Sequence, residues 1–112
     1  MPRCHHLKLW PEFYEPVADR QKTFELRKND RGFAEGDKIV FREWNPEINR
    51  YTGREIVATI TYMLPPEVQS RFPVSGDYAL FSVQVTAAHT RANYRNLPFS
   101  QWLPEGEIQE AS

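Results

Sequence analysis

Three charged side chains stand close together in the first third of the sequence. The segment 22–27 has the form Lys-x-x-Glu-x-Arg, with Glu25 and Arg27 two residues apart. On an extended strand, residues at this spacing project from the same face. The carboxylate and the guanidinium can therefore pair with each other or flank one ligand. Lys22 stands at the start of the strand, from where its amine can reach the same space.

Each member of this trio has a chemical role and a plainer alternative. Glu25 can accept a hydrogen bond from the exocyclic amine of a base, or act as a general acid or base. Lys22 can contact a phosphate, or serve as a catalytic amine if burial keeps it neutral. The alternatives are a structural ion pair of Glu25 with Arg27 or Arg42, and a solvated surface lysine. The pattern leaves both interpretations open, with Lys22 and Glu25 as the catalytic candidates.

Further basic and aromatic residues follow the trio. Arg27, Lys28 and Arg31 are candidates for phosphate contacts, which position a nucleic acid without reading its sequence. Tyr51 and Thr52 are expected in a loop, where they can stack on a flipped base or cap it, but a plain hairpin explains them nearly as well. The full set of predicted ligand-binding residues is Lys22, Glu25, Arg27, Lys28, Arg31, Arg42, Tyr51, Thr52 and Arg54.

The charge of the chain is unevenly distributed. The 112 residues carry 14 Lys and Arg against 15 Asp and Glu, a formal net charge of −1. Residues 20–54 hold nine basic and six acidic side chains, hence +3, and the remainder carries −4. Bulk charge therefore excludes a histone-like mode of polyanion binding. A local basic face is compatible with one compact site for a polyanion, or with a solvated surface of ion pairs.

Hydrophobic alternation predicts a small α+β domain with a curled mixed sheet. A short helix is expected from Pro11, because proline suits a first helical position, and Pro16 must keep it short. Phe24 and Leu26 are expected to pack in the core, with Glu25 and Arg27 on the other face. Segment 64–76 is expected to be a loop with one helical turn. Strands are predicted at residues 5–10, 22–28, 38–44, 54–63 and 77–86.

Several pieces of the sequence together resemble the ASCH domain family of the PUA-like superfamily, in a small branch often seen in phages and prophages. The resemblance spans about residues 5–84. The matching pieces are His5-His6-Leu7-Lys8, the run from Lys22 to Arg31, Gly36-Asp37, Arg42-Glu43-Trp44 and Tyr51-Thr52-Gly53-Arg54-Glu55.

The resemblance implies a PUA-like pseudo-barrel of about five strands, with a cleft beside a short helix that follows the first strand. It also implies binding of RNA, a nucleotide or a modified nucleobase in that cleft. The domain would occupy residues 1–86, followed by a partly irregular C-terminal extension, 87–112. One departure is clear: the family motif has glycine two residues before its lysine, where this sequence has Arg20.

Two alternative functions remain at this point. One enzymatic branch of the resembled family consists of amidohydrolases with a Lys-x-x-Thr motif and a distant glutamate. Lys22 matches that lysine, but Glu25 stands at the threonine position, and Glu55 is only a candidate for the distant glutamate. A small hydrolase acting on a modified nucleoside or on RNA is the first alternative. The second is a phage-encoded protein-interaction module, suggested by the acidic tail with Phe99 and Trp102.

The cysteine and hydrophobic content favour a cytoplasmic protein without a membrane segment. Cys4 is the single cysteine and cannot form an internal disulfide. No secretory signal and no run of 18 apolar residues is present.

Cys4-His5-His6 lacks a second ligand pair with zinc-like spacing, so no metal and no cofactor are expected. His5 shares the period of Leu7 and Leu9 and is expected in the core. The oligomeric state stays open.

Overall fold

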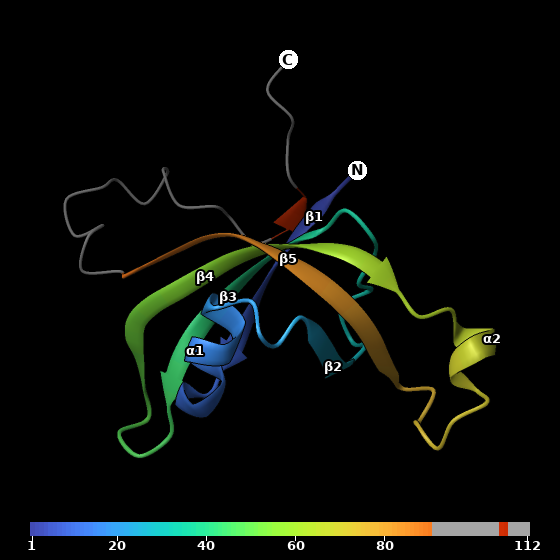
Figure 1. The fold of residues 1–112 in the computed structure, drawn as a ribbon, viewed down its shortest axis with the longest axis horizontal. Helices are drawn as coiled ribbons and strands as arrows, with labels where there is room; N and C mark the ends of the chain where they lie inside the picture. Colours follow the sequence, from blue (N-terminus) through green and yellow to red (C-terminus); the bar gives the residue numbers. More distant parts are fainter. Residues whose placement is uncertain (91–105, 108–112) are drawn as a thin grey trace.

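One curled, mixed β-sheet dominates the computed structural model, which describes residues 1–90 and 106–107 (Figure 1). The strand order is β2-β5-β4-β3-β1-β6, with β1 parallel to β3 and every other neighbouring pair antiparallel. The strands are β1 (Arg3–Leu9), β2 (Phe24–Lys28), β3 (Lys38–Asn45), β4 (Arg50–Met63), β5 (Tyr78–Thr90) and β6 (Gly106–Glu107).

The sheet arches into a half-barrel whose concave face holds the core. Phe41 lies opposite Leu7 on β1 and Ile56 on β4, and all three are buried. Helix α1 (Pro11–Ala18) lies beneath the arch in Figure 1 and buries Tyr14 and Val17. The short α2 (Pro66–Gln69) stands between β4 and β5.

Several sequence predictions are confirmed by this arrangement. The sheet is curled and mixed, a short helix follows the first strand, and one helical turn forms within 64–76. Because both helices are short, the fold is mainly β rather than an even mixture of helix and strand. Neither helix approaches the length of about 20 residues needed to cross a bilayer. The domain boundary expected between residues 86 and 87 falls inside β5, which continues to Thr90.

Of the two interpretations of Tyr51 and Thr52, the plain hairpin is confirmed and the loop is wrong. Strand β4 begins at Arg50, so both residues lie within the β3–β4 hairpin, and Tyr51 pairs with Trp44. The chain reverses earlier, where Asn49 takes a left-handed conformation with φ of 56°. Asparagine tolerates this conformation better than most residues do, so the turn does not need the glycine that follows.

The orientation of β2 is also opposite to the prediction. Phe24 and Leu26 are 57% and 48% exposed, whereas Glu25 is only 2% exposed. The reason is the pairing with β5, which sets Glu25 directly opposite the core residue Phe81. Directly opposed residues share a face of the sheet, so Glu25 and Arg27 are directed to the concave side and the two apolar residues to the convex side.

The C-terminus of α1 positions Lys22. Gln21 and Lys22 each donate a backbone hydrogen bond to the carbonyl of Pro16, at 2.9 Å, and Arg20 donates one to Val17 at 3.1 Å. This is a Schellman-type helix end, and it requires a left-handed residue, which here is Arg20 with φ of 63°. The position where the resembled motif has glycine therefore needs the conformation that glycine adopts most easily.

Replacing Arg20 by glycine should increase stability. Arg20→Gly is expected to raise the free energy of unfolding by about 0.5–1 kcal/mol, since glycine adopts a positive φ without a steric penalty. The matched variant Arg20→Ala keeps the strained backbone and loses the 3.4 Å hydrogen bond to the Val85 carbonyl, so it should be destabilised. Urea unfolding followed by fluorescence measures both. A loss of stability in both variants would show that the side-chain contact outweighs the strain.

Candidate functional site

Glu25 brings the predicted trio together. Its Oε1 accepts a hydrogen bond from Arg27 Nε at 2.9 Å, and its Oε2 accepts one from Lys22 Nζ. The carboxylate is buried, while both cations keep part of their surface exposed. The alternative of a structural pair with Arg27 is confirmed, and the one with Arg42 is wrong. The trio is thus a buried anion covered by two partly exposed cations.

The trio stands at the open side of the half-barrel, between β1 and β2, which are not neighbours in the sheet. Arg27 Nη1 donates to the carbonyl of Lys8 on β1 at 3.1 Å, so its side chain bridges the two strands. Lys22 Nζ also donates to the Phe24 carbonyl at 2.9 Å, on the same strand as Glu25. The two cations therefore hold the opening in a defined geometry.

A cavity of about 410 Å³ lies beside the trio. Three aromatic side chains in its lining, Trp10, Phe13 and Phe24, are each more than two-fifths exposed. Lys22 Nζ lies 4.8 Å from the centre of the Phe24 ring and 5.6 Å from that of Phe13. The lining residues are Lys8, Leu9, Trp10, Phe13, Lys22, Phe24, Glu25, Leu26 and Arg27.

A second charged cluster fastens α1 to the sheet. Arg54 binds Glu43 through two hydrogen bonds, Nε to Oε1 at 2.9 Å and Nη2 to Oε2 at 2.7 Å. The Thr52 hydroxyl donates to the same Oε1 at 2.6 Å. Arg54 also reaches α1, with a 2.8 Å hydrogen bond to Glu15 and its guanidinium 3.8 Å from the centre of the Tyr14 ring. This cluster sets where α1, and with it Phe13, lies on the concave face.

The electrostatics of this second cluster are dominated by the Arg54–Glu43 contact. Its hydrogen bonds hold the pKa of Glu43 below the ordinary value, although burial acts in the opposite direction and Thr52 adds a smaller lowering. The same contact raises the pKa of Arg54. Burial raises the pKa of Tyr14, against the opposing charge of Arg54. Glu43 is thus an ionised carboxylate at neutral pH.

Arg42 and Tyr51 lie on the convex face, away from the trio. The guanidinium of Arg42 lies 3.9 Å from the centre of the Tyr51 ring, and its Nε is 3.6 Å from Glu55 Oε1. Lys8 Nζ lies 3.9 Å above the Trp44 ring, which meets Tyr51 edge-on at 4.9 Å. Glu55, the candidate for a distant catalytic glutamate, therefore faces away from Lys22.

The remaining predicted residues do not join the trio either. Lys28 is exposed at the end of β2, and the side chain of Arg31 lies 3.9 Å from Asp30. Thr52 and Arg54 belong to the Glu43 cluster. Of the nine predicted binding residues, the structure brings together Lys22, Glu25 and Arg27 around one cavity.

Sequence reasoning did not single out Glu43, Trp10 or Phe13 for the site. For Glu43 a signal existed, because it follows Ile39 and Phe41 at intervals of two and so shares their buried face. Trp10 and Phe13 belong to the turn into α1 and to its first turn, where periodicity does not predict which side chains stay exposed. Phe99 and Trp102, cited for a protein-interaction module, lie outside the described residues.

His5 has a structural role in the core. It is buried on the face of Leu7 and Leu9, as predicted, and its Nε2 lies 2.7 Å from Asp37 Oδ2. Its ring meets Phe33 edge-on at 4.8 Å. Within residues 1–90 and 106–107, no group of three His, Cys, Asp or Glu side chains is arranged to hold a metal ion.

The fold and site define a mainly-β half-barrel domain with a buried carboxylate and two cations at its open side. Residues 4–83 match the model of a family described as a domain of unknown function, DUF3850, and the chain belongs to that family. The matched segment contains the whole trio and its cavity.

One phage protein is similar to this chain. An uncharacterised 12.9 kDa protein encoded in the GpA 3′ region of Escherichia phage P2 is 34% identical over 61 residues, which is 54% of each chain. The chain thus spans about half the length of this curated relative. The match confirms the expected phage association.

Removing the charge of Glu25 should destabilise the fold. In Glu25→Gln one carboxylate oxygen becomes an NH2 group, which cannot accept from Lys22 or Arg27, so the free energy of unfolding should fall by about 2 kcal/mol. Glu55→Gln is the matched control on the convex face, where the carboxylate is less deeply buried and has a longer ion pair, 3.6 Å to Arg42, so the loss should be smaller, about 1 kcal/mol. Equal losses in the two variants would show that the trio stabilises the fold no more than the longer Arg42–Glu55 pair does.

The Glu43–Arg54 contact should make the free energy of unfolding depend on pH in the acid range. Because the folded state lowers the pKa of Glu43, its contribution is complete above the ordinary pKa of 4.5 and disappears as the pH falls through the lower folded-state value. Urea unfolding at pH 7 should therefore show Glu43→Gln less stable than the wild type by about 2 kcal/mol. The difference should shrink steadily as the pH falls below 4.5. A difference that stays constant over this range would contradict the assignment.

Proposed function

We propose that this domain binds a nucleotide, either free or within single-stranded RNA, in the cavity between β1 and β2. The observation that carries the proposal is the combination of three exposed aromatic rings, Trp10, Phe13 and Phe24, with the charged trio in one cavity. Base–aromatic stacking is the common device of proteins that bind single strands, and cations beside it hold the backbone.

The size and lining of the cavity support a base-sized ligand. Its volume of about 410 Å³ lies within the range of small-ligand sites. The aromatic rings supply apolar faces for stacking, and Lys22 lies close to two of them. A base held among the rings would leave its phosphate near Lys22 and Arg27.

The trio keeps hydrogen-bonding capacity for a ligand. A carboxylate offers about four acceptor positions, and Glu25 uses two of them on Lys22 and Arg27. It can therefore accept from the exocyclic amine of a base. A guanidinium has five N–H donors, of which Arg27 uses one on Glu25 and one on Lys8. The others are available to a phosphate.

Binding fits the geometry better than hydrolysis. A nucleophilic lysine must present a free amine, whereas Lys22 forms an ion pair with Glu25 and also donates to the Phe24 carbonyl. Glu55 lies on the convex face with Arg42, so it cannot serve as a second catalytic carboxylate beside Lys22.

The curled sheet with a polar cleft beside the first helix also supports a PUA-like, ASCH-type assignment. We also propose a cytoplasmic location, which is supported by the single cysteine, since one cysteine cannot form an internal disulfide.

Fluorescence anisotropy with labelled single-stranded RNA and competing nucleotides tests the proposal. Trp10→Ala should weaken binding about tenfold, since one stacked base contributes about 1–3 kcal/mol. Ile48→Ala is the matched control, because Ile48 is similarly exposed but lies in the β3–β4 hairpin. If Lys22 and Arg27 meet two phosphates, affinity should fall about sevenfold between 50 and 200 mM salt, from the single-strand slope. Absence of binding at 50 mM salt, or full binding by Trp10→Ala, would contradict the proposal.

A second assay separates binding from catalysis. We expect N4-acetylcytidine to remain intact when incubated with the purified protein. Release of acetate that is lost in Lys22→Ala, and retained in the surface control Lys28→Ala, would replace the binding function with amidohydrolysis.

A further inference from the structure

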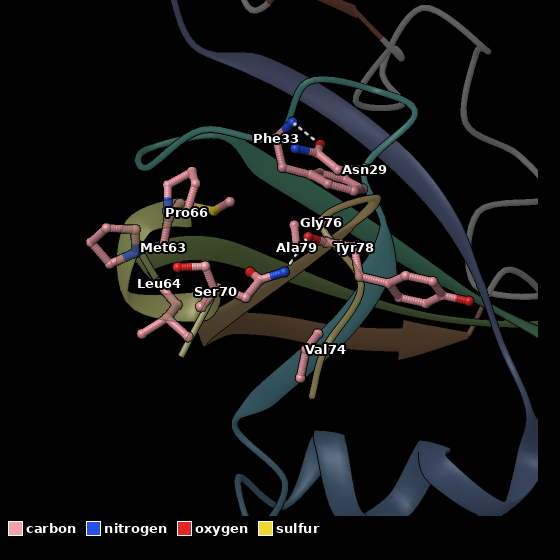
Figure 2. Close-up of a pocket in the computed structure, with 12 residues that line it drawn as sticks. Asn29, Phe33, Met63, Leu64, Pro66, Ser70, Val74, Gly76, Tyr78 and Ala79 are labelled. Carbon is pink, nitrogen blue, oxygen red and sulfur yellow. Dashed lines mark hydrogen bonds between the residues drawn. The ribbon is translucent and has the colours of Figure 1, made fainter. Parts of the chain in front are cut away.

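A second cavity, of about 450 Å³, lies beyond the other end of β2, between the residues after that strand and the connection from β4 to β5 (Figure 2). It shares no lining residue with the cavity beside the trio, and it contains no charged side chain in its lining. Its lining includes the amide side chains of Asn29 and Gln69, the apolar side chains of Phe33 and Met63, and Gly76.

Gln69 leaves one buried acceptor in the wall of this cavity. The residue is only 5% exposed, and its Nε2 donates to the carbonyls of Ser75 at 3.0 Å and Tyr78 at 2.9 Å. The carbonyls of Ser75 and Tyr78 can only accept, so the Gln69 amide atom that faces them must be the nitrogen. Among the described residues, none donates a hydrogen bond to the remaining Oε1. Buried polar atoms are normally satisfied, so such an acceptor points to a missing donor.

Asn29 supplies the complementary group. Its Oδ1 accepts from the backbone N–H of Phe33 at 3.1 Å, a hydrogen bond drawn in Figure 2, and its own backbone N–H donates to the Asp77 carbonyl. Its side-chain Nδ2 donates to no residue in the described part of the chain. The cavity therefore combines the buried acceptor of Gln69, which no described residue satisfies, with the amide donor of the solvent-exposed Asn29 and otherwise mainly apolar walls.

We propose that this cavity is a binding site for an uncharged ring amide, a planar ring that carries an N–H next to a carbonyl, as the uracil ring does. The N–H of such a ring would donate to Gln69 Oε1, and the adjacent carbonyl would accept from Asn29 Nδ2. The apolar side chains of the lining, among them Phe33 and Met63, enclose the faces of the ring. The lack of charge in the lining disfavours anions and cations. The proposal does not depend on nucleotide binding beside the trio.

Chemical-shift mapping with uridine tests the site directly. In uridine the nitrogen at ring position 3 carries the N–H between two carbonyls, and 3-methyluridine lacks this donor while keeping the ring. We expect uridine to shift the backbone amide signals of residues 63–79 and of Asn29 in two-dimensional NMR spectra. 3-Methyluridine should bind at least tenfold more weakly. Equal binding of the two nucleosides would overturn the hydrogen-bonding scheme.

A pair of variants locates the ligand. Gly76→Leu adds a side chain to the lining, and a Cβ at this position meets no atom within 4 Å, so the fold should tolerate it. It should weaken uridine binding at least tenfold. Phe72→Ala, in the same connection but outside the lining, should bind as the wild type does. If uridine shifts only signals of β1, α1 and β2, or shifts none at millimolar concentration, the second site is overturned, whatever the outcome at the trio.

Discussion

The buried carboxylate of Glu25 is the interaction on which the open side of the half-barrel depends. Burying an anion without partners costs several kcal/mol, so the fold must place cations beside it. Lys22 and Arg27 meet this requirement from the same short segment. The consequence is structural as well as electrostatic, because Arg27 then extends to the Lys8 carbonyl and connects two strands that the sheet leaves unpaired.

Helix α1 is positioned by two separate contacts, one at its C-terminus and one on the side that faces the sheet. At its C-terminus, the carbonyl of Pro16 accepts from Lys22 and so delivers the lysine to the trio. On the sheet side, Glu15 and Tyr14 contact Arg54, which Glu43 holds through two hydrogen bonds. Two buried carboxylates, one on β2 and one on β3, therefore define where the aromatic side chains of the helix stand. The cavity is a product of both clusters.

On the two faces of the sheet, the basic side chains contact different groups. On the concave side, the carboxylates of Glu25 and Glu43 are buried, and the cations paired with them stay partly exposed. On the convex side, Arg42 and Lys8 lie over the rings of Tyr51 and Trp44. The local excess of positive charge in residues 20–54 is thus divided between two faces. Net charge along the sequence did not indicate this division, since strand alternation sends neighbouring residues to opposite sides.

The sequence by itself determined the curled mixed sheet, the short helix after the first strand and the proximity of Lys22, Glu25 and Arg27. These features rest on local signals: alternation of apolar residues, prolines at helix positions, and spacing within one strand. The tertiary structure decided which face of β2 is buried and which carboxylate Arg54 meets. It also decided that Trp10 and Phe13 stand beside the trio. The physical reason is that strand register and helix docking are set by partners far along the chain, such as Phe81 opposite Glu25, which local patterns do not identify.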